Sequence, residues 1–133
     1  VTQVMRAELP SSMSFIRPRA MSAVGASLLV LDSGADQVIE FDLYGKPVGV
    51  YAEEDLRNPK ALAADHCGRF YVADDDGLYL GFADMSLPGR RIMLPELAGR
   101  NISDLWTDGV FVFVATRDDG IHMLLIDPSC GAP

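Results

Sequence analysis

Residues 58–74 read Asn-Pro-Lys-Ala-Leu-Ala-Ala-Asp-His-Cys-Gly-Arg-Phe-Tyr-Val-Ala-Asp, which is two short apolar runs separated by a turn at Gly68. The second run, at positions 70–73, holds aromatic and β-branched residues of the kind that favour strands. Polar and apolar residues do not alternate in it, so both faces of the strand are expected to be covered. The stretch therefore predicts a hairpin enclosed between neighbouring sheets.

The same arrangement occurs three times along the chain, starting at Pro18, Pro59 and Ile102. In each copy an apolar run ends at an equivalent position, and these positions lie 42 residues apart. They are Asp32, Asp74 and Thr116. A repeat of about 40–45 residues that contains four short strands is typical of a propeller blade. The sequence therefore predicts an all-β fold, a β-propeller arc of three four-stranded blades.

Residues 58–74 resemble the NHL repeat, whose pattern runs proline, small and apolar residues, aspartate, glycine and a strand ending in Val-Ala-Asp. The first copy is similar through Pro18 and through Val-Leu-Asp at positions 30–32. The third copy departs from the pattern, because Ile102 replaces the proline and Thr116 replaces the aspartate. The resemblance implies NHL-like blades, and six blades as a common number in the family. Propellers of this kind host binding modules and a few enzymes alike.

The predicted strands of the single domain, residues 1–133, do not divide evenly into complete blades. Two full blades are predicted over 17–56 and 57–99, and three strands of a last blade over 100–133. Residues 1–9 are predicted to be an outer strand that completes a divided blade. Closed propellers have about four to eight blades. Three blades would leave apolar sheet faces in water, and those faces must be covered.

Two ways of covering these faces stay open. Two copies could associate head to tail into a six-bladed ring with two-fold symmetry. Alternatively a different protein completes the arc, or the chain is a fragment of a longer propeller. In the first case, residues 1–9 are expected to pair with the strand at 121–126 of the second copy, and in the second case with the other protein. The predicted interface residues are Val1, Val4, Met5, Ile121, Met123 and Leu125.

Acidic residues follow the second strand of every copy, which predicts a negative rim on one face of the arc. One interpretation is a calcium site or a surface for cationic partners, because hard cations bind several carboxylate oxygens. The other is turn chemistry, in which aspartate accepts local backbone N–H groups. The candidate metal ligands are Asp32, Asp74, Asp75, Asp76, Asp118 and Asp119.

Basic residues recur just before each predicted innermost strand, at Arg17, Arg57 and Arg100, with Arg6, Arg19 and Lys60 nearby. They could form a socket for an acidic group, or ion pairs within the blades. Both interpretations stay open.

Residue types that carry catalysis are sparse. The two histidines, His66 and His122, are too few for the three-ligand set of a catalytic zinc site. No Gly-x-Ser-x-Gly elbow occurs. Trp106 is expected in the core with Phe111 and Phe113. We therefore expect a non-enzymatic scaffold for protein–protein assembly that needs no cofactor. The alternatives are a calcium-dependent hydrolase or lactonase, and a sugar- or peptide-binding module.

The composition of the chain limits the classes of partner and the cellular locations that we expect. Nineteen acidic residues against eleven basic ones give a net charge of -8, which argues against nucleic acid as a partner. No apolar run approaches the roughly 20 residues of a membrane-spanning helix. The cysteines, Cys67 and Cys130, are either unpaired thiols or one disulfide of an oxidising compartment. The chain begins at Val1 rather than Met, and we expect an extracytoplasmic protein, periplasmic, surface-bound or secreted.

Overall fold

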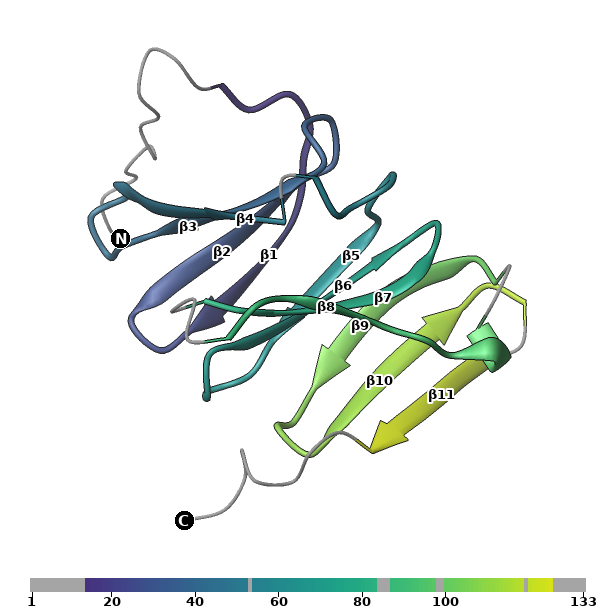
Figure 1. The fold of residues 1–133 in the computed structure, drawn as a ribbon. Coiled ribbons are helices and arrows are strands. Elements are labelled where there is room, and N and C mark those ends of the chain that lie inside the picture. The colour runs from purple at the N-terminus through teal and green to yellow at the C-terminus, as the bar shows by residue number, and fades with distance from the viewer. Residues whose placement is uncertain (1–13, 53, 84–86, 98–99, 119, 126–133) are drawn as a thin grey trace, which may run out of the picture.

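The computed structural model describes residues 14–52, 54–83, 87–97, 100–118 and 120–125. These residues form three antiparallel sheets that lie side by side in chain order, with the first and third sheets at opposite ends (Figure 1). Their only helix is the three-residue 3-10 turn η1 (Pro95–Leu97), so no helix among them is long and apolar enough to cross a membrane. The prediction of an all-β fold is confirmed.

Each sheet follows the chain from its inner to its outer strand. The first sheet contains β1 (Pro18–Val24), β2 (Ser27–Asp32), β3 (Gln37–Phe41) and β4 (Pro47–Tyr51). The second contains β5 (Ala61–Ala64), β6 (Arg69–Asp74), β7 (Gly77–Phe82) and β8 (Arg90–Ile92). The third contains β9 (Ile102–Thr107), β10 (Phe111–Thr116) and β11 (Gly120–Leu125). The predicted outer strand at residues 1–9 lies outside the described residues.

The turns between the first and second strands share one local feature. Gly25, Gly68 and Gly109 occupy equivalent places there, with φ angles of 56°, 85° and 95°. Side-chain-bearing residues rarely adopt positive φ, whereas glycine does so at little steric cost. The repeated glycines of the sequence therefore build the same tight reversal in each sheet.

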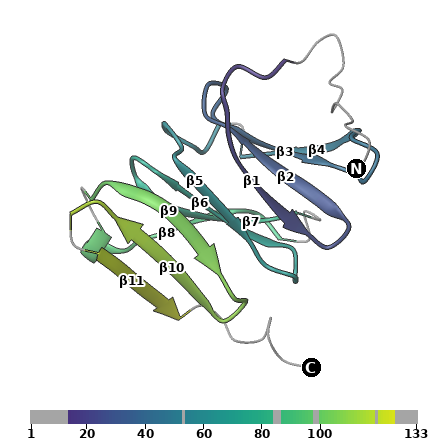
Figure 2. The ribbon, with the colours of Figure 1, turned by 180° about the vertical axis from the view of Figure 1, so that it is seen from behind.

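The inner strands β1, β5 and β9 lie next to one another, and both views show them in this order (Figures 1 and 2). The N–H of Ala64 on β5 donates to the hydroxyl oxygen of Ser22 on β1, at 3.1 Å. The three inner strands thus bring residues from distant parts of the sequence to one side of the molecule.

The hydrophobic core consists of layers between the sheets. Phe70 and Val72 of β6 pack toward the first sheet, while Tyr71 and Ala73 pack toward the third. All four side chains are fully buried. Successive residues of a strand point to opposite faces, so a strand covered on both sides must be apolar throughout. This is why β6 lacks the polar–apolar alternation of a surface strand.

One backbone hydrogen bond recurs in all three sheets and ties the end of the second strand to the segment before the first. The N–H groups of Ser33, Asp75 and Arg117 donate to the carbonyl oxygens of Arg17, Arg57 and Asn101, at 2.9, 2.9 and 3.0 Å. The acidic turns therefore lie next to the basic segments that precede the inner strands.

Cys67, in the turn before β6, is disulfide-bonded. The other cysteine of the chain, Cys130, lies outside the described residues.

Candidate functional site

The third sheet has one face in contact with the second sheet and one that faces away from it. On β10, Val112 and Val114 are fully buried against the second sheet. On β11, the residues that face the other way are largely exposed, with Ile121 at 71%, Met123 at 58% and Leu125 at 67%. These three residues were predicted to be interface residues, and the structure places them together on one surface.

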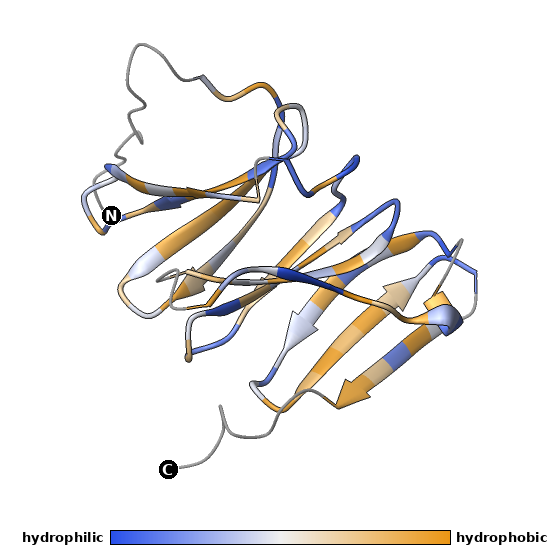
Figure 3. Cartoon of the chain, viewed as in Figure 1, coloured by the Kyte–Doolittle hydropathy of each residue, from blue (hydrophilic) through white to orange (hydrophobic). Residues whose placement is uncertain are grey.

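Aromatic residues of β9 and β10 continue this surface. The register pairs Phe113 with Trp106 on one side and with Met123 on the other. The ring centroid of Phe113 lies 5.3 Å from that of Trp106 and 6.3 Å from that of Phe111. We call the resulting apolar surface the open face, and Figure 3 shows the apolar colouring of β10 and β11. It consists of Trp106, Phe111, Phe113, Ile121, Met123 and Leu125.

The prediction that Trp106 lies in the core is wrong, because its side chain is 61% exposed. Alternation along β9 turns Leu105 toward the second sheet and Trp106 away from it. The sequence indicates an apolar strand here but does not say that one of its two faces is uncovered.

The opposite end of the arc holds a buried apolar cluster. Val30, Ile39 and Phe41 lie on the outward face of the first sheet, and all three are buried. Phe15, in the segment before β1, packs on this cluster, with its ring centroid 5.8 Å from that of Phe41. The two ends of the arc therefore differ among the described residues, since a buried apolar cluster lies on the outward face of the first sheet, although Met21 of β1 is 68% exposed there.

Acidic residues border the open face. Asp104 lies on the same face of β9 as Trp106 and is exposed. Asp108 follows β9, and its carboxylate accepts the N–H groups of Phe111 and Val110, which lower its pKa below the ordinary value. The open face therefore has an acidic border, formed by Asp104 and Asp108.

The first of the predicted metal ligands, Asp32, is fully buried at the end of β2. Its carboxylate accepts four backbone N–H groups, at distances of 2.8 to 3.3 Å. Burial raises the pKa of Asp32, but these hydrogen bonds outweigh it and the pKa lies below the ordinary value. The donors are Ile16, Arg17, Gly34 and Ala35. Asp32 thus holds the turn after β2 against the segment before β1.

Asp74, at the equivalent end of β6, accepts the N–H groups of Arg57 and Asp76 at 2.8 and 2.9 Å. It also accepts two hydrogen bonds from the guanidinium of Arg91 on β8. The hydrogen bond to Asp74 is the main reason why the pKa of Arg91 is raised. This carboxylate therefore connects the inner and outer strands of the second sheet.

The other candidate ligands are spread along the acidic turns. Asp75 lies 3.3 Å from the ammonium of Lys60, and Asp76 lies 3.6 Å from the guanidinium of Arg57. Asp118 is exposed after β10, and Asp119 lies outside the described residues. Within the described ranges, no three His, Cys, Asp or Glu side chains come close enough to hold a metal ion.

A buried ion pair that sequence reasoning missed joins the second and third sheets. Arg69 lies 2.8 Å from the carboxylate of Asp65, and both side chains are buried. The guanidinium also donates to the carbonyl of Gly109 in the β9–β10 turn, at 2.9 Å. The signal available in the sequence was the position of Asp65 and Arg69 on either side of the turn at Gly68.

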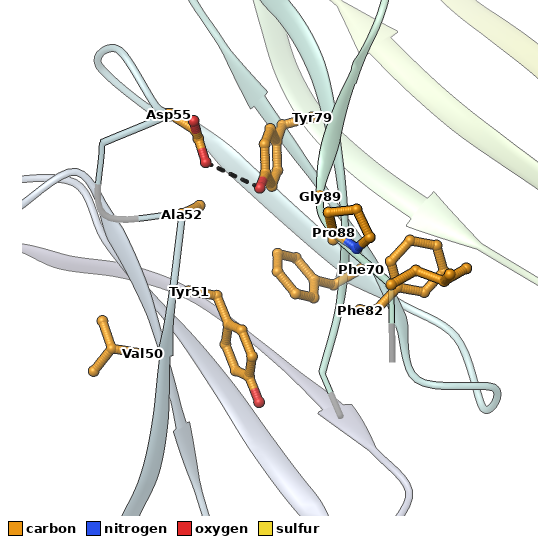
Figure 4. A pocket seen from close by; sticks show the side chains of 11 residues that line it. Val50, Tyr51, Ala52, Asp55, Phe70, Tyr79, Phe82, Pro88 and Gly89 are labelled. Atoms are coloured by element: carbon orange, nitrogen blue, oxygen red, sulfur yellow. Dashed lines mark hydrogen bonds between the residues drawn. The ribbon is translucent and has the colours of Figure 1, made fainter. Parts of the chain in front are cut away.

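A cleft of about 380 Å³ separates the outer strands of the first and second sheets (Figure 4). Tyr51 of β4 lines one wall, and Tyr79 and Phe82 of β7 line the other. The Tyr79 hydroxyl donates to Asp55 at 3.2 Å. Burial, together with the nearby Asp55 carboxylate, raises the pKa of Tyr79 to about 12. The cleft offers aromatic walls and one carboxylate, a combination that suits a small polar ligand with an apolar side.

Comparison with known proteins by sequence gives no match, either to a family model or to a curated protein. Comparison by structure gives similar folds at low sequence identity. The Pan2 WD40 domain of Neurospora crassa matches with a TM-score of 0.62 and 17% identity, over 84% of this chain and 32% of that one.

Two bacterial proteins are also similar. PorZ, a surface component of the type-IX secretion system of Porphyromonas gingivalis, matches with a TM-score of 0.60 and 14% identity, over 84% of this chain and 15% of PorZ. An inferred exported protein of Bacteroides fragilis matches with a TM-score of 0.64 and 14% identity, over 90% of this chain and 37% of that one.

These likenesses show a propeller-like fold, and they do not single out the NHL type of blade. The chain spans between 15% and 37% of the similar proteins' lengths.

Proposed function

We propose that the protein is a non-enzymatic propeller scaffold with NHL-like blades, whose open face binds a β-sheet of a partner protein and so extends the arc. The observation that carries this proposal is the exposure of Trp106, Ile121 and Met123 on one continuous sheet face. Exposed apolar patches of this kind mark interaction sites in soluble proteins. The equivalent face of the second sheet is already used in this way, since the third sheet packs on it.

Charge favours a different protein over a second copy as the occupant. Each chain carries a net charge of -8, and Asp104 and Asp108 lie at the border of the open face. Two open faces packed on each other would bring these borders together, and like charges at an interface are unfavourable. A head-to-tail ring of two copies would instead use the outward face of the first sheet, where Phe15 already packs on Val30, Ile39 and Phe41. The proposed partner therefore presents an apolar sheet face with a basic border.

The non-enzymatic part of the proposal is supported by how the acidic side chains are used. The carboxylates of Asp32 and Asp74 hold backbone N–H groups and the guanidinium of Arg91. These contacts fit a structural role for the conspicuous acidic residues better than a calcium site for a hydrolase or lactonase.

An extracytoplasmic location is the last part of the proposal. A disulfide at Cys67 fits an oxidising compartment, because reducing compartments keep thiols free. Two of the similar structures also come from a surface component and an inferred exported protein.

The test places a photo-crosslinking amino acid at position 123 in the protein expressed in its source cells. Position 48 is the matched control, because Val48 is 56% exposed on β4, in the first sheet. We expect a crosslink to one protein with a β-sheet domain from position 123 and none from position 48. Ile121→Glu in the same chain should abolish it, because a charge cannot be buried there without a partner. Equal crosslinking from both positions, or none from either, would contradict the proposal.

Light scattering on the purified chain separates the two kinds of partner. A hetero-assembly requires a mass near 14.4 kDa for the isolated protein. A mass near twice this value, lost in Ile121→Glu, would replace the proposed partner with a second copy.

A further inference from the structure

A pocket of about 260 Å³ lies where the three inner strands begin. Every sheet contributes to it, and three of the six lining residues are cationic although the protein as a whole is acidic. The lining residues are Arg19, Lys60, Asn101, Ile102, Ser103 and Arg117. We call it the basic pocket.

The backbone fixes how these residues come together. The N–H of Lys60 donates to the carbonyl of Ala73 at 2.7 Å, which ties the start of the second sheet's inner strand to β6. The N–H of Arg117 donates to the carbonyl of Asn101 at 3.0 Å and holds the residue after β10 beside the start of β9. Because β1, β5 and β9 are neighbours, Arg19 at the start of β1 faces the same space. The pocket therefore forms because the three sheets lie side by side, and no single sheet contains it.

The arginines of the basic pocket differ from the other arginines near the acidic turns. Arg57, Arg69 and Arg91 each form an ion pair with an aspartate. The guanidinium groups of Arg19 and Arg117 have no carboxylate partner among the residues that the structure describes. These two guanidinium groups and the amide of Asn101 line the same pocket. Together they offer hydrogen-bond donors that a carboxylate ligand could accept from.

We propose that the basic pocket binds a carboxylate group of an acidic peptide segment. Guanidinium groups bind carboxylates with two parallel hydrogen bonds, which gives orientation as well as charge neutralisation. Of the three cations of the pocket, Lys60 already pairs with the carboxylate of Asp75, at 3.3 Å. The guanidinium groups of Arg19 and Arg117 are left for the carboxylate of the ligand.

This site is separate from the open face. The open face belongs to the third sheet and points away from the arc, whereas the basic pocket lies at the ends of all three inner strands. The inference therefore does not depend on the proposed partner sheet, and one can fail while the other holds.

The test measures fluorescence anisotropy of a labelled hexaglutamate peptide titrated with the purified protein. We expect saturable binding that Arg19→Gln and Arg117→Gln each weaken by about tenfold or more, since a hydrogen bond to a charged group contributes about 1.5–3 kcal/mol. Arg90→Gln is the matched control. It removes the same charge from an exposed position on β8 outside the pocket and should leave binding unchanged.

Competition identifies the ligand chemistry. Succinate should displace the peptide at lower concentration than inorganic phosphate does. Displacement by phosphate at lower concentration than succinate would overturn the carboxylate assignment. An equal loss of binding in Arg90→Gln would mean unspecific attraction and overturn the site, as would absence of binding to the unmodified protein.

Discussion

The second and third sheets are built from the same repeat, yet equivalent positions in them have opposite surroundings. Leu78 and Tyr71 of the second sheet are fully buried under the third sheet. Their counterparts in the register of the third sheet are Ile121 and Phe113, and Ile121 is exposed. The repeat specifies an apolar face in both cases. Whether that face is core or interface depends only on what lies next to it.

Truncating one residue from each sheet gives the largest expected difference. Leu78→Ala should lower the free energy of unfolding by about 2–5 kcal/mol, because it leaves a cavity between two sheets. Ile121→Ala should change it by no more than about 0.5 kcal/mol in the isolated chain, because this side chain is already in water. Urea unfolding followed by circular dichroism measures both values.

A large loss of stability in Ile121→Ala would break the comparison, because it would mean that the isolated chain already covers the open face. The same experiment on the complex with the partner tests the comparison further. In the complex, Ile121→Ala should lower the free energy of unfolding as much as truncation of a buried residue does.

The ends of the second strands give a second contrast, between Asp74 and Thr116. Asp74→Ala should cost about 2–3 kcal/mol, because the half-buried Arg91 and two backbone N–H groups lose their acceptor. Thr116→Val should cost about 1 kcal/mol, because its hydroxyl donates to the carbonyl of Gly120. Thermal unfolding of the two variants compares them. An equal loss would show that the carboxylate has no larger structural role than the hydroxyl.

The fold was predictable because its signals are local and repeated. The 42-residue spacing of Asp32, Asp74 and Thr116 predicts equal units, and the glycines before each second strand place the turns. The apolar character of β6 on both faces predicts stacking, which the structure shows. The predicted interface residues on β11 lie on one exposed surface because strand alternation can be followed residue by residue.

The candidate sites were less predictable because they depend on contacts between sheets. Nothing near Trp106 in the sequence says that its face of β9 lacks a neighbour. The basic pocket brings Arg19 and Arg117 together from positions almost a hundred residues apart. The position of Arg69, which reaches the carbonyl of Gly109, likewise follows from packing and not from any motif.

Asp32 extends the contrast to the first sheet, with a smaller expected effect than Asp74. Its carboxylate binds only backbone N–H groups among the described contacts, whereas Asp74 also binds Arg91. Asp32→Asn should cost about 1–2 kcal/mol at pH 7, because the amide keeps one acceptor oxygen but turns a donor toward the N–H of Ile16.

The pH dependence of this variant identifies the charge as the cause. The pKa of Asp32 is lower in the folded protein than its ordinary value of 3.8, so its contribution to stability is present above that pH and is lost as the pH falls through the folded-state pKa. The unmodified protein should therefore lose stability below about pH 4 more steeply than Asp32→Asn, and the gap between the two should narrow. Urea unfolding at pH 7, 5, 4 and 3 measures this gap. A gap that stays constant down to pH 3 would mean that the shape of the side chain matters at this position and that its charge does not.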